Sequence, residues 1–323
     1  PDNIDVFTKP ISYLSVECMS DNGEAHSVKI SVSASEQFCV QPKLQNCILT
    51  EGFSLENGIS VMKMGGSEQN ILGYSGDDTG IDWGYFYLAV EGGKTEEHHI
   101  GKMTFVKASK EFRISADKSS CVLFVFAYDD IYSVKYFGKM LKAYWKRGGK
   151  DISELIAEAF TVYEPILKRC EEFDERLCSD AKRIGGEKYA ELLQLSLRQI
   201  MAAHKAVIDE NGELLYISKE CLSNGCASTV DITYPSIPFY LLYNPRLIYG
   251  MMRPVIKFAN SGLWKYNFAP HDVGTYPILS GQVYACNCLE NQMPVEESGN
   301  MLLCTYALCK MLGNSEYADE NRD

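Results

Sequence analysis

The stretch from His26 to Ser33, with the sequence HSVKISVS, alternates apolar and polar residues on the period of a β-strand. Its valines and isoleucine fall on one face and its lysine and serines on the other, which is typical of a half-buried antiparallel strand. The run from Ile11 to Cys18 is similarly rich in strand-forming residues. Asp21-Asn22-Gly23 lies between the two runs and supplies turn residues, so we expect the two strands to form a hairpin.

Further strand-like runs follow at short intervals as far as Asp129-Asp130. They are Gly84 to Glu91, Met103 to Lys107 and the almost continuously apolar Cys121 to Tyr128, with breaks rich in glycine and asparagine between them. Many short strands in succession predict an antiparallel β-sandwich over residues 1–130.

After residue 130 the apolar residues recur at steps of three and four, which predicts amphipathic helices. We expect a helical linker over residues 131–180, with Asp151 as its N-cap and Pro165 as a kink or restart. A helical domain is expected over residues 181–323. Its helices are predicted after Gly185-Gly186 as far as Asn211-Gly212, after Asn244-Pro245, and from Pro294 through Leu312 to Gly313.

The composition indicates a folded protein and excludes some partners. The 323 residues are 46% hydrophobic and 23% charged, which suits roughly two folded domains. Lys and Arg number 31 against 43 Asp and Glu, and the formal charge of −12 disfavours binding to nucleic acid phosphates. No run approaches the roughly 18 consecutive apolar residues of a membrane-spanning helix. We therefore expect neither nucleic acid nor a membrane as partner.

Twelve cysteines are scattered along the chain, and no pair has the two-residue spacing of a zinc knuckle. We expect free, mostly buried thiols, no metal site and no cofactor. Abundant thiols favour a reducing compartment such as the cytoplasm. The chain opens at Pro1 without a signal segment and looks cut at both ends, so we expect an internal fragment, and secretion stays open.

Two long connections, Lys219 to Pro238 and Phe268 to Gln292, concentrate carboxylates, amides and aromatic residues beside glycine and proline. The start of the last predicted helix, from Gln292 to Asn300, has a similar composition. Long connections between packed helices are where functional sites are usually built. We therefore expect the catalytic and substrate-binding residues in these segments.

Glu296 and Glu297 have two interpretations that the sequence leaves open. Acids in a first turn complement the helix dipole, and Pro294 is common there, which predicts ordinary capping. Neighbours on a helix point about 100° apart, so one glutamate could instead face a pocket. Glycosidic hydrolysis needs two carboxylates, and spacing does not select a pair from Asp231, Asp272, Glu296 and Glu297.

Other polar residues point to chemistry less strongly. His271, beside Asp272, fits a structural hydrogen-bonding role better than an acid–base role. His204 is expected on an apolar helix face, and Glu96 to His99 in a solvated charged turn. Ser218-Lys219 is a poor Ser–Lys couple because adjacent residues rarely face each other. The motifs of α/β-hydrolases, P-loop enzymes and zincins do not occur.

Several long and unusual blocks match a known family. They are PDNID at 1–5 with KPISYL at 9–14, DWGY at 82–85, YDDIYS at 128–133, SKE at 218–220 with SNG at 223–225, TVDITYPS at 229–236, HDVGTYP at 271–277 and QMPVEESGNM at 292–301. In these blocks the sequence resembles the glutaminase A family of fungi and bacteria, and the resemblance covers essentially the whole chain. It implies a β-sandwich followed by a six-hairpin α/α toroid, of which this chain would contain part of the sandwich and about the first half of the toroid.

The resemblance also implies an enzyme with a small-molecule substrate, which hydrolyses L-glutamine or a related small amide to glutamate and ammonia. A fragment of this extent is expected to be inactive by itself. In such toroids, loops at one end of the inner helices line the funnel. By that analogy the residues around the funnel are Asp231, Tyr234, His271, Asp272, Glu296 and Glu297. From the chemistry of the side chains we take Glu296, Glu297 and Asp272 as the candidate catalytic residues, and as candidate substrate contacts Asp231, Tyr234, His271, Lys219, Asn224 and Asn300. We expect one carboxylate to act as a base on water, while a second, protonated carboxylate or His271 assists the leaving group.

Three alternatives stay open on the sequence. A Ser or Thr nucleophile could serve an amidase. A six-hairpin glycoside hydrolase acting on an oligosaccharide is favoured by the barrel type and by the aromatic residues of the loops. A noncatalytic carbohydrate-binding or structural protein would use the β-sandwich for binding.

Overall fold

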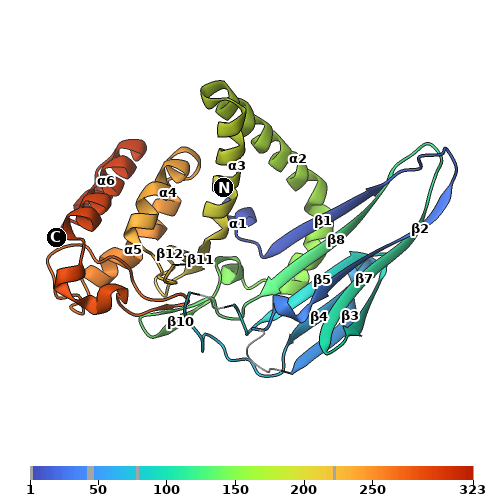
Figure 1. Ribbon diagram of the computed structural model, residues 1–323, viewed down its shortest axis with the longest axis horizontal. Coiled ribbons are helices and arrows are strands. Elements are labelled where there is room, and N and C mark those ends of the chain that lie inside the picture. The colour runs from blue at the N-terminus through green and yellow to red at the C-terminus, as the bar shows by residue number, and fades with distance from the viewer. Residues whose placement is uncertain (1–2, 42–46, 78–79, 221–222, 323) are drawn as a thin grey trace.

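Figure 1 shows the computed structural model, which describes residues 3–41, 47–77, 80–220 and 223–322. The strands of its first part form two sheets, and all of their neighbouring strands are antiparallel. The five-stranded sheet has the order β1 (Ile11–Cys18), β8 (Ser120–Asp129), β5 (Tyr85–Glu91), β4 (Ile59–Gly66) and β3 (Ile48–Leu55). The three-stranded sheet has the order β2 (His26–Ser35), β7 (Met103–Ile114) and β6 (Lys94–Ile100). The predicted β-sandwich is confirmed.

The predicted hairpin between the first two long strands is wrong. β1 pairs with β8, and β2 pairs with β7, so the two strands lie in different sheets. The turn residues Asp21-Asn22-Gly23 carry the chain from one layer to the other. Each strand then finds its partner among strands that come much later in the sequence.

Two apolar cores explain why β8 is apolar along nearly its whole length. Between the sheets, Phe124 packs in a buried cluster with Leu88 and Val106. On the other face of the five-stranded sheet, Val125 packs in a second cluster with Leu155 of α2 (Ile152–Gly185). A strand that is covered on both faces has no solvent side, so it does not alternate.

Helices dominate the second part of the chain, and the predicted order of strands before helices is confirmed. Besides α2 they are α3 (Glu187–Ala202), α4 (Val230–Tyr243), α5 (Arg246–Ala259), α6 (Pro294–Leu312) and the short α7 (Glu316–Glu320), and α1 (Ile4–Phe7) precedes the first strand. Single turns of 3-10 helix lie at Glu36–Phe38, Glu56–Gly58, Tyr144–Gly148, Tyr284–Asn287 and Leu289–Asn291.

Predicted helix signals at two helices agree with the structure. Asp151 caps α2 through a reciprocal pair of hydrogen bonds with Glu154. Pro165 lies inside that helix, which continues to Gly185, so no new helix starts there. α6 ends at Leu312, and Gly313 follows it with a φ of 73°. A left-handed residue after a helix is the usual position for glycine.

Short strand pairs replace helix or loop in several places. The stretch 131–180, expected to be a helical linker, begins with β9 (Val134–Tyr136) and β10 (Lys139–Leu141), which form a small sheet with β13 (Ile278–Leu279). His204, expected on a helix, starts β11 (His204–Ile208), which pairs with β12 (Leu214–Ser218). The acids and histidines from Glu96 to His99 lie in strand β6 instead of a turn.

The expected connection from Lys219 to Pro238 is shorter than predicted because α4 begins at Val230. Pro235 and Pro238 lie inside this helix. Proline ordinarily disfavours a helix interior, so the sequence pattern suggested a loop. The apolar residues of α4, including Ile237 and Tyr240, pack in a buried cluster with α5. We attribute the helical conformation to this tertiary packing.

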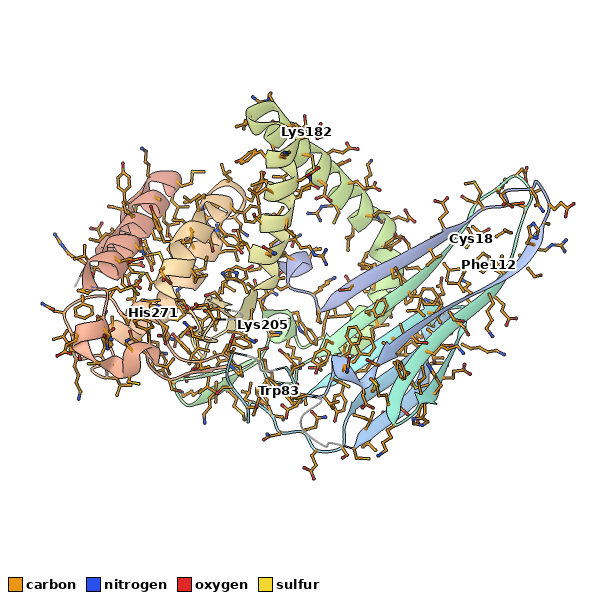
Figure 2. All side chains as sticks on the ribbon, in the orientation of Figure 1. Cys18, Trp83, Phe112, Lys182, Lys205 and His271 are labelled. Atoms are coloured by element: carbon orange, nitrogen blue, oxygen red, sulfur yellow. The ribbon has the colours of Figure 1, made fainter. Side chains whose placement is uncertain are left out.

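An ion pair between a half-buried lysine and a buried aspartate joins the strand part to the helical part. Lys205 Nζ of β11 lies 2.6 Å from Asp130 Oδ2, just after β8. Trp83 Nε1 donates to the carbonyl oxygen of the same Asp130 at 2.8 Å. Figure 2 labels Trp83 and Lys205 at this junction and His271 among the helices.

Two predictions from composition can be compared with the structure. Among the described residues, no helix is both long enough and apolar enough to cross a membrane. The described cysteines are free, but the expectation that most are buried is wrong, since only Cys39, Cys226 and Cys304 among them are buried. Cys221 lies outside the described residues, as do Pro1 and Asp2 of the first matching block.

Candidate functional site

The loop over residues 270–284 is fixed against the start of α4 by main-chain hydrogen bonds. The N–H of Val230 donates to the oxygen of His271 at 2.8 Å, and the N–H of Val273 donates to that of Ala227 at 3.0 Å. Gly274 has a φ of +140°, and a Cβ there would lie 2.3 Å from the oxygen of Ile278. The tight path of the loop therefore requires glycine at this position.

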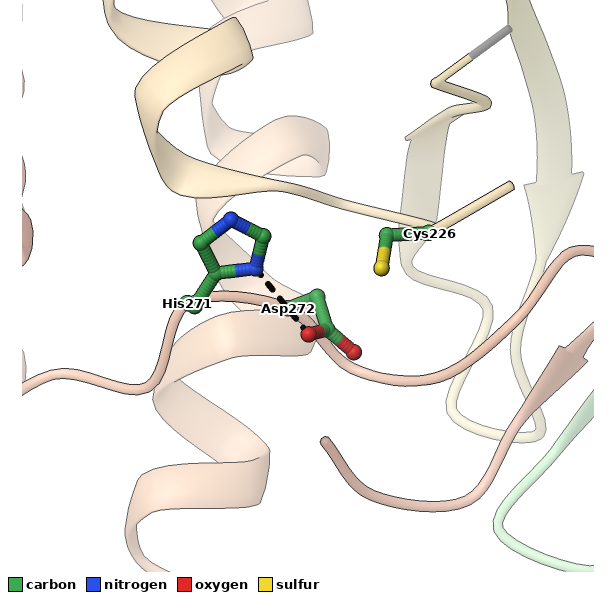
Figure 3. Close-up of side chains that lie close together, drawn as sticks. All are labelled: Cys226, His271 and Asp272. Atoms are coloured by element: carbon green, nitrogen blue, oxygen red, sulfur yellow. Dashed lines mark hydrogen bonds and ion pairs between the residues drawn. The ribbon is translucent and has the colours of Figure 1, made fainter. Parts of the chain in front are cut away.

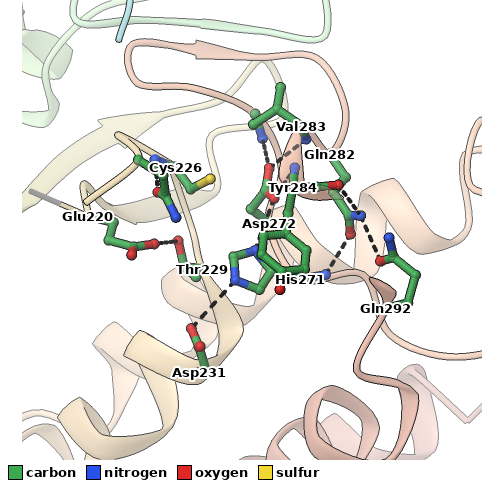
Figure 4. A network of polar contacts seen from close by, with 12 residues as sticks. Glu220, Cys226, Thr229, Asp231, His271, Asp272, Gln282, Val283, Tyr284 and Gln292 are labelled. Carbon is green, nitrogen blue, oxygen red and sulfur yellow. Dashed lines mark hydrogen bonds and ion pairs between the residues drawn. The ribbon is translucent and has the colours of Figure 1, made fainter. Parts of the chain in front are cut away.

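Asp272 is fully buried, and four donors surround its carboxylate (Figure 4). Oδ1 accepts from the main-chain N–H groups of Gly274 at 2.9 Å and Val283 at 3.0 Å. Oδ2 accepts from the N–H of Tyr284 at 3.1 Å and from Nδ1 of His271 at 3.0 Å. Both oxygens are therefore occupied, and the side chain is placed to orient His271 and to hold the loop.

The ring of His271 is held on two sides. Its Nδ1 contacts Asp272, as Figure 3 shows, and its face stacks on Tyr284 with ring centroids 4.0 Å apart. Its Nε2 lies 3.9 Å from Oδ1 of Asp231. Burial opposes protonation of the ring, but the hydrogen bond to Asp272 and the nearby acids Asp231 and Glu297 together raise the pKa of His271.

Glu297 and Asp231 approach the ring from the first turns of two helices. Glu297, at the start of α6, is 1% exposed, and neither of its carboxylate oxygens has a hydrogen-bond partner among the described residues. Asp231, at the start of α4, has a side chain that is 32% exposed, but its Oδ1 is buried and equally unpartnered. Burial raises the pKa of Glu297 to about 8 and raises that of Asp231, while His271 opposes both shifts.

These contacts bring Asp231, His271 and Glu297 together, with one atom of each within 4.8 Å of the others. We call this set the acid–histidine cluster. The N-terminal ends of α4 and α6 add partial positive charge near the carboxylates. The cluster has the groups that proton transfer or cation binding requires.

The structure separates the two neighbouring glutamates of α6. Glu296 is exposed, whereas Glu297 is buried against His271, so one of the pair faces inward as the helical geometry allowed. Tyr234 of α4 is 41% exposed, and Asn300 of α6 is half-buried.

Lys219 and Asn224 lie on the chain that leads into α4. Lys219 forms an isolated antiparallel bridge with Ala227, and its side chain is half-buried. Oδ1 of the exposed Asn224 accepts from the main-chain N–H of Cys226 at 2.8 Å, which shapes the turn. Ser218 is buried in β12, and Thr229 Oγ1 donates to Glu220 at 3.3 Å. None of these contacts connects a hydroxyl to the acid–histidine cluster.

Gln282 contributes to the site but was not singled out from the sequence, and Tyr284 was considered only as one of the aromatic residues of the loops. Oε1 of Gln282 accepts from the main-chain N–H of His271 at 2.7 Å, and its Nε2 donates to Oε1 of Gln292 at 2.8 Å. Tyr284 supplies the stacking face. The sequence offered one signal for them, since both lie in the long connection from Phe268 to Gln292 that we expected to hold the chemistry.

Comparison with protein families matches nearly the whole chain. Residues 186–323 match the glutaminase A six helical-hairpin domain, and residues 1–115 and 108–180 match a domain of unknown function, DUF5127. The chain belongs to the glutaminase A family. The predicted fold class, an antiparallel β-sandwich followed by part of a six-hairpin α/α toroid, is confirmed.

Two fungal relatives carry glutaminase names. The chain is 22% identical to glutaminase A of Aspergillus oryzae over 355 residues, covering 99% of this chain and 50% of the relative. It is 29% identical to a probable glutaminase of Arthroderma benhamiae over 174 residues, covering 54% of this chain and 20% of the relative. The chain therefore spans at most half the length of these two family members.

A solved structure of a putative kojibiose phosphorylase from the human microbiome is also similar. It aligns with a TM-score of 0.49 and 14% identity, covering 98% of this chain and 39% of that one.

Proposed function

We propose that this chain carries the hydrolytic site of a glutaminase-type amidohydrolase, which converts L-glutamine or a related small amide to glutamate and ammonia. The glutaminase names of the fungal relatives support the choice of substrate class. The observation on which the proposal depends is the acid–histidine cluster, in which two carboxylates with unpartnered oxygens flank one oriented imidazole.

The proposed reaction uses Asp231 as the base, because its side chain is the one carboxylate of the cluster with access to solvent. Asp231 takes a proton from a water molecule, and the resulting hydroxide attacks the amide carbon of the substrate. The carbon–nitrogen bond then breaks, and the proton passes to the leaving nitrogen, which departs as ammonia. His271 and the ends of α4 and α6 stabilise the negative charge that develops on the amide oxygen.

Asp272 has a positioning role in this proposal. Its oxygens are occupied by three main-chain donors and by His271, so it fixes the orientation of the imidazole. Glu297 lies beside His271, and burial raises its pKa to about 8, so in this proposal it relays the proton from Asp231 to the leaving nitrogen. Glu296 takes no part because its side chain lies on the exposed side of α6.

The test is ammonia release from glutamine by the intact protein and three single variants. Asp231→Asn and Glu297→Gln should each lower kcat by about 100-fold or more, the usual contribution of an acid–base group. Glu296→Gln is the matched control and should retain activity within about twofold. Equal activity of the Glu296→Gln and Glu297→Gln variants would contradict the proposed site.

One observation favours a second candidate function. Asp231 and Glu297 place carboxylate oxygens within 4.8 Å of each other, which is close to the spacing of the two acids in retaining glycosidases. A glycoside hydrolase of the six-hairpin type would use the same two residues. Hydrolysis of aryl glycosides without ammonia release from glutamine would select this function over the first.

A further inference from the structure

The acid–histidine cluster has more acidic than basic groups. Asp231 and Glu297, together with the neighbouring Asp272, surround the single imidazole of His271, and the four donors described above are all directed to Asp272. Both oxygens of Glu297 and Oδ1 of Asp231 are buried without a partner among the described residues. A buried carboxylate without a donor is costly unless a cation or another donor satisfies it.

The orientation of His271 leaves one nitrogen for a ligand. Nδ1 faces Asp272 Oδ2 at 3.0 Å, and because that oxygen accepts hydrogen bonds, Nδ1 carries the hydrogen. Nε2 lies 3.9 Å from the unpartnered Oδ1 of Asp231. A ring nitrogen of His271, an Asp231 oxygen and a Glu297 oxygen all lie within 4.8 Å of one another. Histidines that bind metals nearly always donate their other N–H to a carboxylate or carbonyl, which fixes the ring. Stacking on Tyr284 restrains the ring further.

We propose that Asp231 Oδ1, His271 Nε2 and the Glu297 carboxylate form a binding site for one divalent first-row metal ion. Imidazole and carboxylate ligands suit Zn²⁺ or Mn²⁺, and three protein ligands leave a position open for water, as in catalytic metal sites. Ligands about 2.1 Å from a metal lie roughly 3 to 3.5 Å apart. The 3.9 Å between Nε2 and Oδ1, and separations of up to 4.8 Å within the set, therefore require the three side chains to move closer together around the ion.

A second grouping, of Cys226, His271 and Asp272, is a weaker candidate. Its three ligand atoms also lie within 4.8 Å of one another. It draws on Asp272, however, and the oxygens of that residue already accept four hydrogen bonds. The site at Asp231 and Glu297 uses only atoms that lack partners.

The metal ion would take part in the proposed amide hydrolysis, and this catalytic role rests on the proposed function. A metal-bound water loses its proton more readily than bulk water and attacks as hydroxide. With Asp231 bound through Oδ1, its second oxygen can still take that proton. The proton then moves to the leaving nitrogen when the carbon–nitrogen bond breaks, so atoms and charges balance without a redox step.

Mn²⁺ binding to the metal-depleted intact protein tests the proposal, with free Mn²⁺ measured by electron paramagnetic resonance. Mn²⁺ is the probe because the chain has 12 cysteines, which would bind Zn²⁺ elsewhere. A salt concentration of about 0.15 M screens weak binding to surface acids. We expect one ion per chain for the unsubstituted protein and for Glu296→Gln.

Asp231→Asn and Glu297→Gln should weaken Mn²⁺ binding by at least about 100-fold, and Asp272→Asn by about 10- to 100-fold through loss of His271 orientation. Glu297→Gln removes a buried, unpartnered carboxylate, so its thermal midpoint without metal should equal or exceed that of the unsubstituted protein. Binding that is the same in Glu297→Gln and Glu296→Gln would overturn the metal site.

The test separates the metal site from the proposed reaction. Mn²⁺ binding that depends on Asp231 and Glu297, without ammonia release, would support the metal site and contradict the amidohydrolase function. Ammonia release that persists unchanged in the chelator-treated protein, with no Mn²⁺ bound, would support the amidohydrolase function and contradict the metal site.

Discussion

Replacement of Asp272 by asparagine should destabilise the helical part of the protein more than any other loss of one charge at the site. The carboxylate accepts two hydrogen bonds on each oxygen, whereas the asparagine amide offers only one oxygen. One pair of donors is therefore left facing an NH₂ group. Hydrogen bonds to a charged group contribute about 1.5 to 3 kcal/mol each, so the loss of two should cost about 4 kcal/mol.

The assay for Asp272→Asn is thermal unfolding followed by circular dichroism. A loss of about 4 kcal/mol should lower the midpoint by about 10 °C for a domain of this size. Asp231→Asn is the matched control, because its Oδ1 has no hydrogen-bond partner among the described residues. That control should change the stability by less than about 1 kcal/mol. If Asp272→Asn loses no more stability than Asp231→Asn, the assignment of Asp272 as the structural centre of the loop is wrong.

Three further predictions concern other parts of the fold. Burial lowers the pKa of His204 to about 4, so the folded state holds it neutral. In the unfolded state His204 protonates near pH 6.5, so the free energy of unfolding should fall by at most about 3 kcal/mol as the pH drops from 6.5 to 4. Urea titrations of His204→Phe should show a smaller fall over the same pH range. Gly274→Ala should cost at least about 2 kcal/mol through its clash with Ile278 O, whereas Gly299→Ala, in an open position within α6, should be neutral or stabilising by up to about 1 kcal/mol in the same melting assay. Lys205→Met should cost about 3 kcal/mol by leaving Asp130 buried without its cation, and equal denaturant midpoints for this variant and Lys205→Met/Asp130→Asn would count against that account.

Strong local patterns were sufficient to predict several elements. The alternation from His26 to Ser33 predicted β2, and the capping signals at Asp151 and Gly313 agree with the ends of two helices. The partner of each strand was not predictable in this way. β1 and β2 are neighbours in sequence but belong to different sheets, because pairing depends on which faces the whole sandwich buries.

The secondary structure predicted from the sequence was wrong where tertiary packing outweighed the local preference of the residues. α4 contains Pro235 and Pro238, and we expected a connection there. Its burial against α5 was not visible from its own residues. His204 lay in an apolar run that fits either period, and pairing with β12 placed it in a strand.

The sequence by itself determined the family, the order of strands before helices, and the two segments in which polar residues gather. It also named Asp231, His271, Asp272 and Glu297 as candidates. Only the tertiary structure decided which role each residue has, because the role depends on which hydrogen-bond donors and neighbours reach its side chain. Asp272 receives four donors, Glu297 receives none from the described residues, and Glu296 points away to solvent. Spacing along the chain predicted no metal site, yet the three proposed ligands come from separate segments that meet only when α4, α6 and the loop between residues 270 and 284 pack together.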